Sequence, residues 1–473
     1  MKLQVLILSI LQFGAIPFCG LAQINQTGWS EKECLKHAQI AFQLIDLTSG
    51  KTLQKQNEQQ LLTPASTAKL LTVATALHFL GDTFKTKTQV FLVGNKSNDG
   101  LWKGNLVFKG FGDMGLTSKD EKNIINQTIN NLKSQGIFAI EGEIIVDPFY
   151  FDYNEMLIPG GYTWEDMGNY FASPNSAFSL NSNSYSVFFK QGIKGDTAQI
   201  QSISPSMIGN YFDFKSHVIY GAAHSGDQSW IYSAPLGDQI FINGTVPEGI
   251  SDFEIRGSIP NPAAFFAEYF LNELNGNGIS VNGISSVKFV DTKVAQLLIN
   301  WPSAPLSDWI KDVNQKSNNF YAEMILCHLG ASIGKPNYAG GIEMVNKYII
   351  EVLKDKTPVV VKDGSGLSPI NAQSVAFQTQ ILLNMKNNLT FLSSLAISGE
   401  LGTLKNSFLQ PELAGKLKGK SGSIAGVMAY AFYFESKSGK PMACSFIINH
   451  HQCKATDLKE LIANQIIKWI QTY

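Results

Sequence analysis

The sequence predicts an α/β (α+β) fold in which strands from both ends of the chain form one sheet and a large, mostly β region is inserted between them. Alternating apolar runs lie near the N-terminus, in residues 38–58, and strand-like runs followed by a helical run close the chain. Between them, residues 86–260 consist mainly of strand-like runs separated by Gly, Asn, Asp and Pro turns. The length of 473 residues is too great for one ordinary core and agrees with a divided domain.

The first part of the divided domain is expected at residues 23–85. It begins with a hairpin, because a Thr-Ser-Gly break at residues 48–50 separates two alternating runs. Apolar residues then recur at helical spacing from Ser66 until a glycine stop signal. Ser66 is therefore expected in the first turn of a buried helix, with Lys69 one turn further along the same face.

The inserted β-rich region, residues 86–260, is expected to contain two lobes and one helical run, at residues 119–136. Helical patterns return after it, so the second part of the divided domain is expected at residues 261–473. That part closes with a hairpin and a final helix, and no internal repeat is visible.

The N-terminal residues 1–22 have the pattern of a secretory signal sequence, with an early lysine, a short apolar run and small residues before an expected cleavage after Ala22. A membrane anchor would need a longer apolar run, and Pro17 and Phe18 are poor residues before a lipid anchor on Cys19. No other segment is apolar enough to cross a bilayer. We therefore expect an exported, periplasmic protein with no stable transmembrane segment after cleavage, either free or held at the cell envelope.

The charge balance argues against nucleic-acid binding, since Lys plus Arg total 37 against 38 for Asp plus Glu and the net charge is -1. Arginine is almost absent, and Arg256 is the only one in the chain. We therefore expect any bound carboxylate to be met by lysine, hydroxyl or backbone N–H groups, without a bidentate guanidinium.

The cysteine spacing gives no support for a metal site, and neither a metal nor another cofactor is expected. The cysteines that remain after signal cleavage, without C-x-x-C or histidine-adjacent ligand spacing, are Cys34, Cys327, Cys444 and Cys453. Export permits a disulfide, and Cys444 with Cys453 is the pair nearest in sequence, but buried thiols are an equal alternative.

Ser66 and Lys69 form an S-x-x-K pair that could supply an activated nucleophile. A serine hydroxyl needs a partner that takes its proton, and the chain has no G-x-S-x-G elbow of the Ser-His-Asp type. A neutral lysine one helical turn away can play that part. The spacing alone is weak, because Ser285 and Lys288 share it, but those residues lie in a strand-like run that would send their side chains to opposite faces.

Two further triplets give this pair a context. An S-x-N triplet at residues 317–319 follows an amphipathic helical run, and a K-S-G triplet at residues 420–422 leads directly into an apolar strand-like run. Each is weak alone. Other S-x-N triplets occur in the chain, and a second K-S-G, at residues 437–439, lies in the expected hairpin turn.

Together and in this order, the motifs resemble those of the penicillin-binding proteins and serine β-lactamases. With KGFGDMGL at residues 109–116 and DGSGLS at residues 363–368, the chain resembles the class C low-molecular-mass penicillin-binding proteins, the D-Ala-D-Ala carboxypeptidase/endopeptidase family, over nearly its whole mature length. The resemblance implies a transpeptidase-like domain with a two-lobed insertion between the first two motifs. The long separation of Ser66 from Ser317 is hard to explain for a β-lactamase.

The resemblance also implies roles for the motif residues. Ser66 would attack the carbonyl of the penultimate D-Ala, and Lys69 would be its base. Ser317 would relay a proton to the leaving amine, Asn319 would hold Lys69 and the substrate amide, and Lys420 would supply positive potential. Two ammonium groups crowded around one hydroxyl depress each other's pKa, which favours a neutral lysine.

The K-S-G strand would also bind substrate. Many relatives have Lys-Thr-Gly where this chain has Lys-Ser-Gly, so Ser421 stands in place of the threonine and keeps its hydroxyl. That hydroxyl would meet the terminal carboxylate, next to Gly422. Backbone N–H groups of Ser66 and Ser423 would form the oxyanion hole, worth about 3–4 kcal/mol per donor in other acyl-transfer enzymes. Ile424 would either line the same pocket or pack in the sheet.

Residues of the insertion and of one loop bear on specificity. The family often has arginine after DGSGLS, whereas this chain has Pro369, which puts a diaminopimelate-type preference in doubt. Trp164 and Asp166 would supply an aromatic wall and a carboxylate for a substrate amino group, or else belong to a surface loop with a packed tryptophan.

The function expected from the resemblance is a serine-type D-Ala-D-Ala carboxypeptidase and/or endopeptidase. Its partners would be peptidoglycan stem peptides, with β-lactams as acylating inhibitors. One alternative is a β-lactamase or esterase-like hydrolase, for which no dedicated glutamate base is visible. The other is a catalytically silent peptidoglycan-binding protein, against which the intact motif residues argue.

Overall fold

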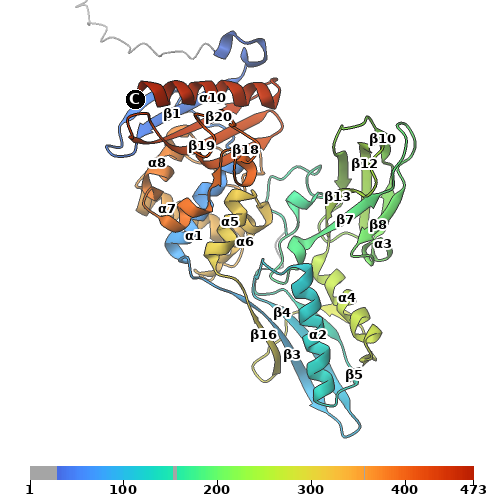
Figure 1. The fold of residues 1–473 in the computed structure, drawn as a ribbon. Coiled ribbons are helices and arrows are strands. Elements are labelled where there is room, and N and C mark those ends of the chain that lie inside the picture. The colour runs from blue at the N-terminus through green and yellow to red at the C-terminus, as the bar shows by residue number, and fades with distance from the viewer. Residues whose placement is uncertain (1–28, 153–156, 356) are drawn as a thin grey trace, which may run out of the picture.

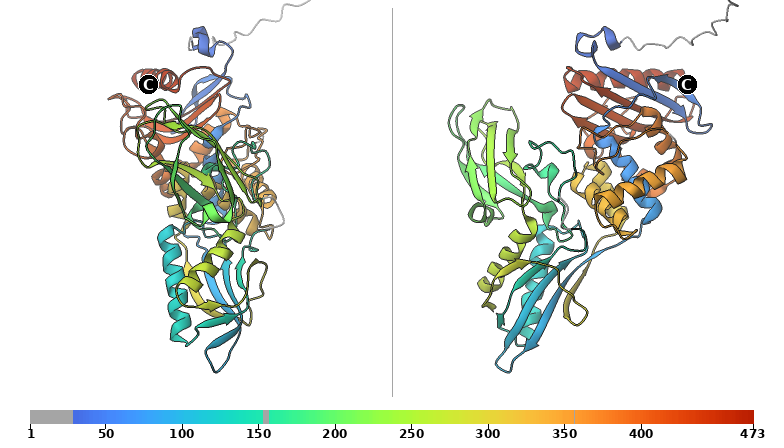
Figure 2. Two further views of the ribbon diagram at one scale, coloured as in Figure 1. Left: turned by 90° about the vertical axis from the view of Figure 1, so that its right-hand side faces the viewer. Right: turned by 180° about the vertical axis from the view of Figure 1, so that it is seen from behind.

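The computed structural model describes residues 29–152, 157–355 and 357–473 (Figure 1). The expected signal sequence and its cleavage after Ala22 lie outside these residues, as does Cys19. The described chain forms a core domain, from which two inserted lobes extend (Figure 2). Within the described residues, no helix combines the length and the apolar character needed to span a membrane.

The core domain contains a six-stranded antiparallel sheet made from both ends of the chain, as the sequence predicts. First-hairpin strand β1 pairs with C-terminal strand β20 from Gln39 opposite Asn449 to Asp46 opposite Met442. In spatial order, the strands are β17 (Ala396–Ile397), β18 (Lys418–Ile424), β19 (Val427–Glu435), β20 (Pro441–Asn449), β1 (Gln39–Asp46) and β2 (Thr52–Gln56). The strand of the K-S-G triplet, β18, is thereby held by β19 at one side and by the short β17 at the other.

Apolar side chains cover both faces of this sheet. On one face, the C-terminal helix α10 (Ala455–Thr472) places Trp469 against Phe42 and Phe446, with ring centroids 5.7 and 5.3 Å apart. On the other face lies helix α8 (Val375–Met385), whose Val375 packs with Ala429 and Ile447. Burial on both faces explains the nearly continuous apolar runs of β19 and β20.

Helices form the remainder of the core domain. The central one, α1 (Lys69–Phe79), is buried on almost all sides, which agrees with its Leu-, Val- and Ala-rich sequence. Around it lie α5 (Leu306–Gln315), α6 (Asn319–Ala331), α7 (Tyr338–Tyr348), which continues as a π-helical turn η6 (Ile349–Leu353), and α9 (Leu389–Ser394). Short 3₁₀ turns occur at η1 (Trp29–Glu31), η2 (Glu33–Leu35), η3 (Ala65–Ala68), η4 (Tyr170–Ala172), η5 (Asn181–Asn183) and η7 (Gly402–Leu404).

The first inserted lobe is a mixed sheet with two helices. Its strands are β3 (Lys87–Lys96), β4 (Leu101–Gly110), β5 (Ala139–Glu141), β6 (Ile144–Asp147), β14 (Ser280–Val281), β15 (Ser285–Val287) and β16 (Gln296–Pro302). Helices α2 (Ser118–Ser134) and α4 (Pro262–Gly276) lie along it (Figure 1). Ser285 is on a strand, as expected for the second S-x-x-K pair.

The insertion extends further than the expected boundary at residue 260. Strand β16 pairs with β3 at the start of the insertion, from Gln296 opposite Leu92 to Pro302 opposite Lys87. Helix α4 buries Phe270 against Phe108 of β4, with ring centroids 4.0 Å apart. Residues 261–302 therefore belong to the insertion and not to the second part of the core domain. The sequence assigned the helical pattern of α4 to the core domain. A helix that covers an inserted sheet has the same apolar pattern as a core helix, so the pattern alone cannot separate the two.

The second inserted lobe consists of two small sheets. One contains β9 (Asp213–Ser216), β10 (Ile219–Gly221), β11 (Gln228–Tyr232) and β12 (Gln239–Pro247), and the other contains β7 (Ser184–Phe189), β8 (Ile200–Ser204) and β13 (Phe253–Ser258). The short helix α3 (Ile208–Tyr211) contacts β8 and β9. In Figure 1 this lobe stands beside the helical part of the core domain.

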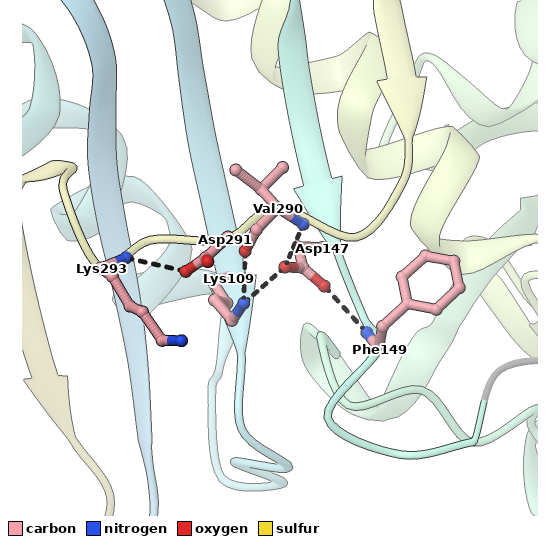
Figure 3. A network of polar contacts seen from close by, with 6 residues as sticks. All are labelled: Lys109, Asp147, Phe149, Val290, Asp291 and Lys293. Atoms are coloured by element: carbon pink, nitrogen blue, oxygen red, sulfur yellow. Dashed lines mark hydrogen bonds and ion pairs between the residues drawn. The ribbon is translucent and has the colours of Figure 1, made fainter.

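A buried ion pair connects three segments of the first lobe (Figure 3). Lys109 Nζ on β4 donates to Asp147 Oδ2 on β6 at 2.7 Å and to the carbonyl oxygen of Val290 at 2.9 Å. The same carboxylate accepts from the N–H groups of Val290 and Phe149, both at 3.0 Å. The charge of this lysine is thus fully matched where it is buried.

The disulfide differs from the pair that is nearest in sequence. Cys34 bonds to Cys453, which joins the segment before β1 to the segment before α10. Cys444 is instead buried within β20 and carries no disulfide. Among the described residues, no cluster of three or more His, Cys, Asp or Glu side chains could hold a metal ion.

Candidate active site

Ser66 lies in a tight turn that packs between strand β18 and the DGSGLS loop. The turn η3 is a 3₁₀ helix, and α1 begins at Lys69, so the expected helical start is present with a tighter first turn. Ala65 has a φ of 46°, in the left-handed region that most residues avoid. The turn is therefore held in a conformation that depends on its neighbours.

Two glycines allow this close approach. A Cβ atom at Gly422 of β18 would lie 2.9 Å from the backbone nitrogen of Ser66, and one at Gly366 would lie 2.0 Å from the carbonyl oxygen of Ala65. Any larger residue would push the Ser66 turn away. The glycine of the K-S-G triplet thus brings β18 against the nucleophile turn, and the DGSGLS loop closes the opposite side.

Lys69 is fully buried beneath Ser66. Its Nζ lies 2.9 Å from Ser66 Oγ, and it donates to Asn319 Oδ1 and to the carbonyl oxygen of Ser365, both at 2.6 Å. The two latter atoms can only accept hydrogen bonds. In a neutral amine they take both N–H groups, which leaves the nitrogen lone pair directed at the Ser66 hydroxyl. The arrangement is that of a base in contact with its nucleophile.

Burial is the main cause that makes a neutral lysine available. Desolvation lowers the pKa of Lys69 to about 7, against the opposing effect of the Asp363 and Glu323 carboxylates. Desolvation, followed by the charge of Lys69, also holds the pKa of Lys420 well below its usual value. The sequence interpretation gave the repulsion between two ammonium groups as the cause, whereas in the structure burial is larger.

Two buried carboxylates shape the loop that contacts Lys69. Glu323 Oε1 accepts from Tyr162 Oη at 3.0 Å and from the N–H of Ser365 at 2.8 Å, and Asp363 accepts from the N–H groups of Gly366 and Ser368. Burial raises the pKa of both carboxyl groups. These contacts turn the Ser365 carbonyl toward Lys69. The sequence analysis missed Glu323, although its position four residues after Asn319 places both on one helical face.

The S-x-N triplet spans the start of α6. Ser317 precedes the helix with a φ of 58°, and Asn318 caps it by accepting from the N–H of Tyr321 at 3.0 Å. Asn319 is the first helical residue, and its Nδ2 donates to the carbonyl oxygen of Phe171 in the insertion at 2.8 Å. One N–H of Asn319 is therefore already engaged by the protein, which leaves only the other for a substrate amide.

The K-S-G triplet brings the second lysine to the site. Lys420 is fully buried on β18, and its Nζ donates to Ser317 Oγ at 2.9 Å and to the carbonyl oxygen of Ser421 at 2.7 Å. Ser421 Oγ donates to Thr403 Oγ1 at 2.8 Å. The structure thus brings together the expected catalytic residues, which are Ser66, Lys69, Ser317, Asn319 and Lys420.

A cleft of about 960 Å³ opens onto Ser66 between the core domain and the second lobe. Ser423 and Ile424 line it, so Ile424 faces the cleft instead of packing only in the sheet. Asp166 also lines it, with Oδ2 accepting from Thr163 Oγ1 at 2.8 Å. Trp164, for which the sequence left open an aromatic wall or a packed surface tryptophan, is 63% exposed and stacks on Tyr232 at 4.7 Å.

Arg256 is a cleft residue that the sequence analysis did not place in the site. It lies on β13 and lines the same cleft as Ser66. The expectation that a bound carboxylate is met without a guanidinium stays a prediction, although one guanidinium does line the cleft. Its sequence context, a strand-like run in the insertion, carries no motif, and only the packing of the second lobe against the core domain brings it to the cleft.

Comparisons with known proteins agree with the fold. Residues 23–473 match the model of the D-Ala-D-Ala carboxypeptidase 3 (S13) family. The chain is 26% identical over 447 residues to a D-alanyl-D-alanine carboxypeptidase of Actinomadura sp. (strain R39), which covers 89% of this chain and 79% of that protein.

The solved structure of penicillin binding protein 4 (dacB) from Haemophilus influenzae superposes with a TM-score of 0.81 at 22% identity, covering 95% of this chain and 99% of that one. The same protein complexed with a β-lactam gives a TM-score of 0.75 at 21% identity, with 93% and 98% covered. The expected fold class is confirmed.

Proposed function

Because the chain belongs to the D-Ala-D-Ala carboxypeptidase 3 (S13) family and is a serine carboxypeptidase of the penicillin-binding class, we propose that Ser66 is its nucleophile and Lys69 the general base. The observation that carries the proposal is the position of Lys69 Nζ, buried and 2.9 Å from Ser66 Oγ, with two acceptors taking its hydrogens. The proposed substrates are peptidoglycan stem peptides that end in D-Ala-D-Ala.

In the acylation step, Ser66 Oγ attacks the carbonyl carbon of the penultimate D-Ala while its proton passes to Lys69 Nζ. The C–N bond to the leaving residue then breaks, and the amine receives a proton through the Ser317 hydroxyl, which is hydrogen-bonded to Lys420. Water subsequently hydrolyses the ester and frees Ser66. When the leaving amine is a terminal D-Ala the reaction is that of a carboxypeptidase, and when it belongs to a crosslinked strand the reaction is that of an endopeptidase.

The rest of the motifs would bind the substrate. The backbone N–H groups of Ser66 and Ser423 would receive the oxyanion, since β18 lies directly against the Ser66 turn at Gly422. The Ser421 hydroxyl would exchange Thr403 for the terminal carboxylate. Asp166 in the cleft would meet a substrate amino group, and Trp164 would extend the aromatic wall through its stacking on the cleft residue Tyr232.

Export to the periplasm is part of the same proposal. Residues 1–22 have the pattern of a signal sequence, and the disulfide between Cys34 and Cys453 suits an oxidising compartment. The peptidoglycan substrate lies in that compartment.

Benzylpenicillin and intact-mass spectrometry test the nucleophile. The purified protein should gain one penicilloyl group, and peptide mapping should place it on Ser66. The Ser66→Ala variant should fold with an unchanged melting temperature but gain no adduct. An adduct on another residue, or a folded protein that neither forms an adduct nor destroys the penicillin, would contradict the proposal. Rapid loss of the penicillin would instead favour the β-lactamase alternative.

A further inference from the structure

We propose that Arg256 and Tyr170 form a second binding subsite, in the insertion wall of the cleft, for a carboxylate of the stem peptide that lies away from the scissile bond. This inference rests on the proposed function, because it assumes an anionic peptide in the cleft. It adds to the motif residues a specificity-determining group from the second lobe.

The guanidinium is held in a defined position. Its Cζ lies 4.7 Å from the centroid of the Tyr170 ring, and Nη2 donates to Ser184 Oγ at 3.1 Å. Stacking on an aromatic face leaves the edge of the guanidinium open, and the edge carries the paired N–H groups that bind a carboxylate in bidentate fashion. Arg256 is exposed and Tyr170 is 46% exposed, so a ligand in the cleft can reach both.

The charge of Arg256 is not matched by an acidic neighbour. In the described part of the chain, no carboxylate oxygen lies within 4.0 Å of its guanidinium. Asp166, an acidic residue that lines the cleft, accepts a hydrogen bond from Thr163 and forms no ion pair with Arg256 in the described residues. By contrast, Lys316, another basic residue that lines the cleft, is paired with Asp312 at 2.9 Å. The only arginine of the chain therefore keeps its ion-pairing capacity for a ligand.

The subsite is fixed relative to the catalytic residues. Phe171, which follows Tyr170, accepts at its carbonyl from Asn319 Nδ2 at 2.8 Å, and Asn319 in turn binds Lys69. On the other side, the N–H of Ser258 on β13 donates to the carbonyl oxygen of Gly168 at 2.9 Å. The segment that carries Tyr170 thus links β13, through Asn319, to Lys69. A ligand bound to Arg256 would therefore be held in a defined position relative to Ser66.

The ligand chemistry follows from these contacts. A bidentate, charge-assisted pair with a carboxylate suits an arginine better than a lysine. The carboxylate must belong to a part of the peptide beyond the terminal D-Ala, because the K-S-G strand is the site proposed for the terminal carboxylate. Such a carboxylate can come from the stem peptide that is being cleaved or from the second peptide of a crosslink.

Matched peptides test the subsite. The probes are a synthetic L-Ala-γ-D-Glu-L-Lys-D-Ala-D-Ala pentapeptide and the same peptide with the glutamyl α-carboxylate converted to a carboxamide, each as a monomer and as a crosslinked dimer. For the wild type, kcat/KM should be about tenfold higher with the carboxylate form, chiefly through KM. A preference in the monomer assigns the carboxylate to the same peptide, and a preference confined to the dimer assigns it to the second one.

Variants complete the test. Arg256→Gln should bring the ratio of carboxylate to carboxamide kcat/KM close to one, and Arg256→Lys should give an intermediate ratio. Lys215→Gln, on an exposed strand of the same lobe, should keep the wild-type ratio. Equal kcat/KM for both forms in the wild type, or an unchanged ratio in Arg256→Gln, would overturn the subsite. Failure of the proposed function is recognised separately, by the absence of a penicilloyl adduct on Ser66 of the wild type.

Discussion

Buried lysines occur both in the candidate active site and in the first inserted lobe, but their surroundings differ. Lys109 in the lobe donates to Asp147 at 2.7 Å and is part of a network of matched groups (Figure 3). Lys69 and Lys420 contact hydroxyl, amide and carbonyl oxygens, and in the described residues no carboxylate oxygen lies within 4.0 Å of either Nζ. The lobe keeps a buried charge, whereas the site favours a neutral amine.

The difference separates a structural use of lysine from a chemical one. A buried ion pair holds strands and a loop together when the carboxylate has its remaining lone pairs filled, as Asp147 has. A buried lysine without a counter-ion loses its proton more easily, because desolvation penalises the charged form. Only the second kind can accept a proton from Ser66 near neutral pH.

The largest effect is expected for Lys69→Met. The substitution removes the base and leaves an apolar chain of similar length, so penicilloylation of Ser66 should slow on the order of 10²- to 10⁴-fold. The fold should be retained, with a loss of stability of about 1–3 kcal/mol at most, because the buried acceptors on Asn319 and Ser365 lose their donor. The rate is measured by intact-mass spectrometry after timed mixing with benzylpenicillin, and thermal unfolding serves as the control. A slowing of less than about tenfold would remove Lys69 as the base.

Asp147→Asn should produce the opposite pattern. It leaves Lys109 buried without its counter-ion, which should lower the free energy of unfolding by about 3–5 kcal/mol, as measured by urea denaturation. The acylation rate of the protein that remains folded should stay unchanged. The double variant Lys109→Met/Asp147→Leu should recover only part of the lost stability, because the N–H groups of Val290 and Phe149 lose their acceptor. An Asp147→Asn protein as stable as the wild type would show that the ion pair does not hold the lobe together.

The sequence was informative where a short motif carries its own context. The S-x-x-K, S-x-N and K-S-G motifs named five side chains that lie together in the structure, namely Ser66 and the four groups around it. The terminal hairpins predicted the shared sheet. These features depend on local spacing and on apolar periodicity, both of which can be read from the chain directly.

Other features depend on how distant segments fold back on each other, and the sequence did not reveal them. Cys34 lies 419 residues from its partner Cys453, so proximity along the chain pointed to the wrong pair. Glu323 reaches Tyr162 only because the insertion loop returns to the core domain. Arg256 comes to the cleft through the packing of a whole lobe, and the end of the insertion is defined by the pairing of β16 with β3.

The measurement that tests the central claim most directly is the acylation rate of the wild type by benzylpenicillin as a function of pH. Burial lowers the pKa of Lys69 to about 7, so the neutral base is scarce below that pH and abundant above it. The second-order rate constant should therefore rise about tenfold per pH unit between pH 5 and about 6.5 and level off above about pH 7.5. A rate that is flat across this range, or one that falls as the pH rises, would contradict the assignment of Lys69 as a neutral base.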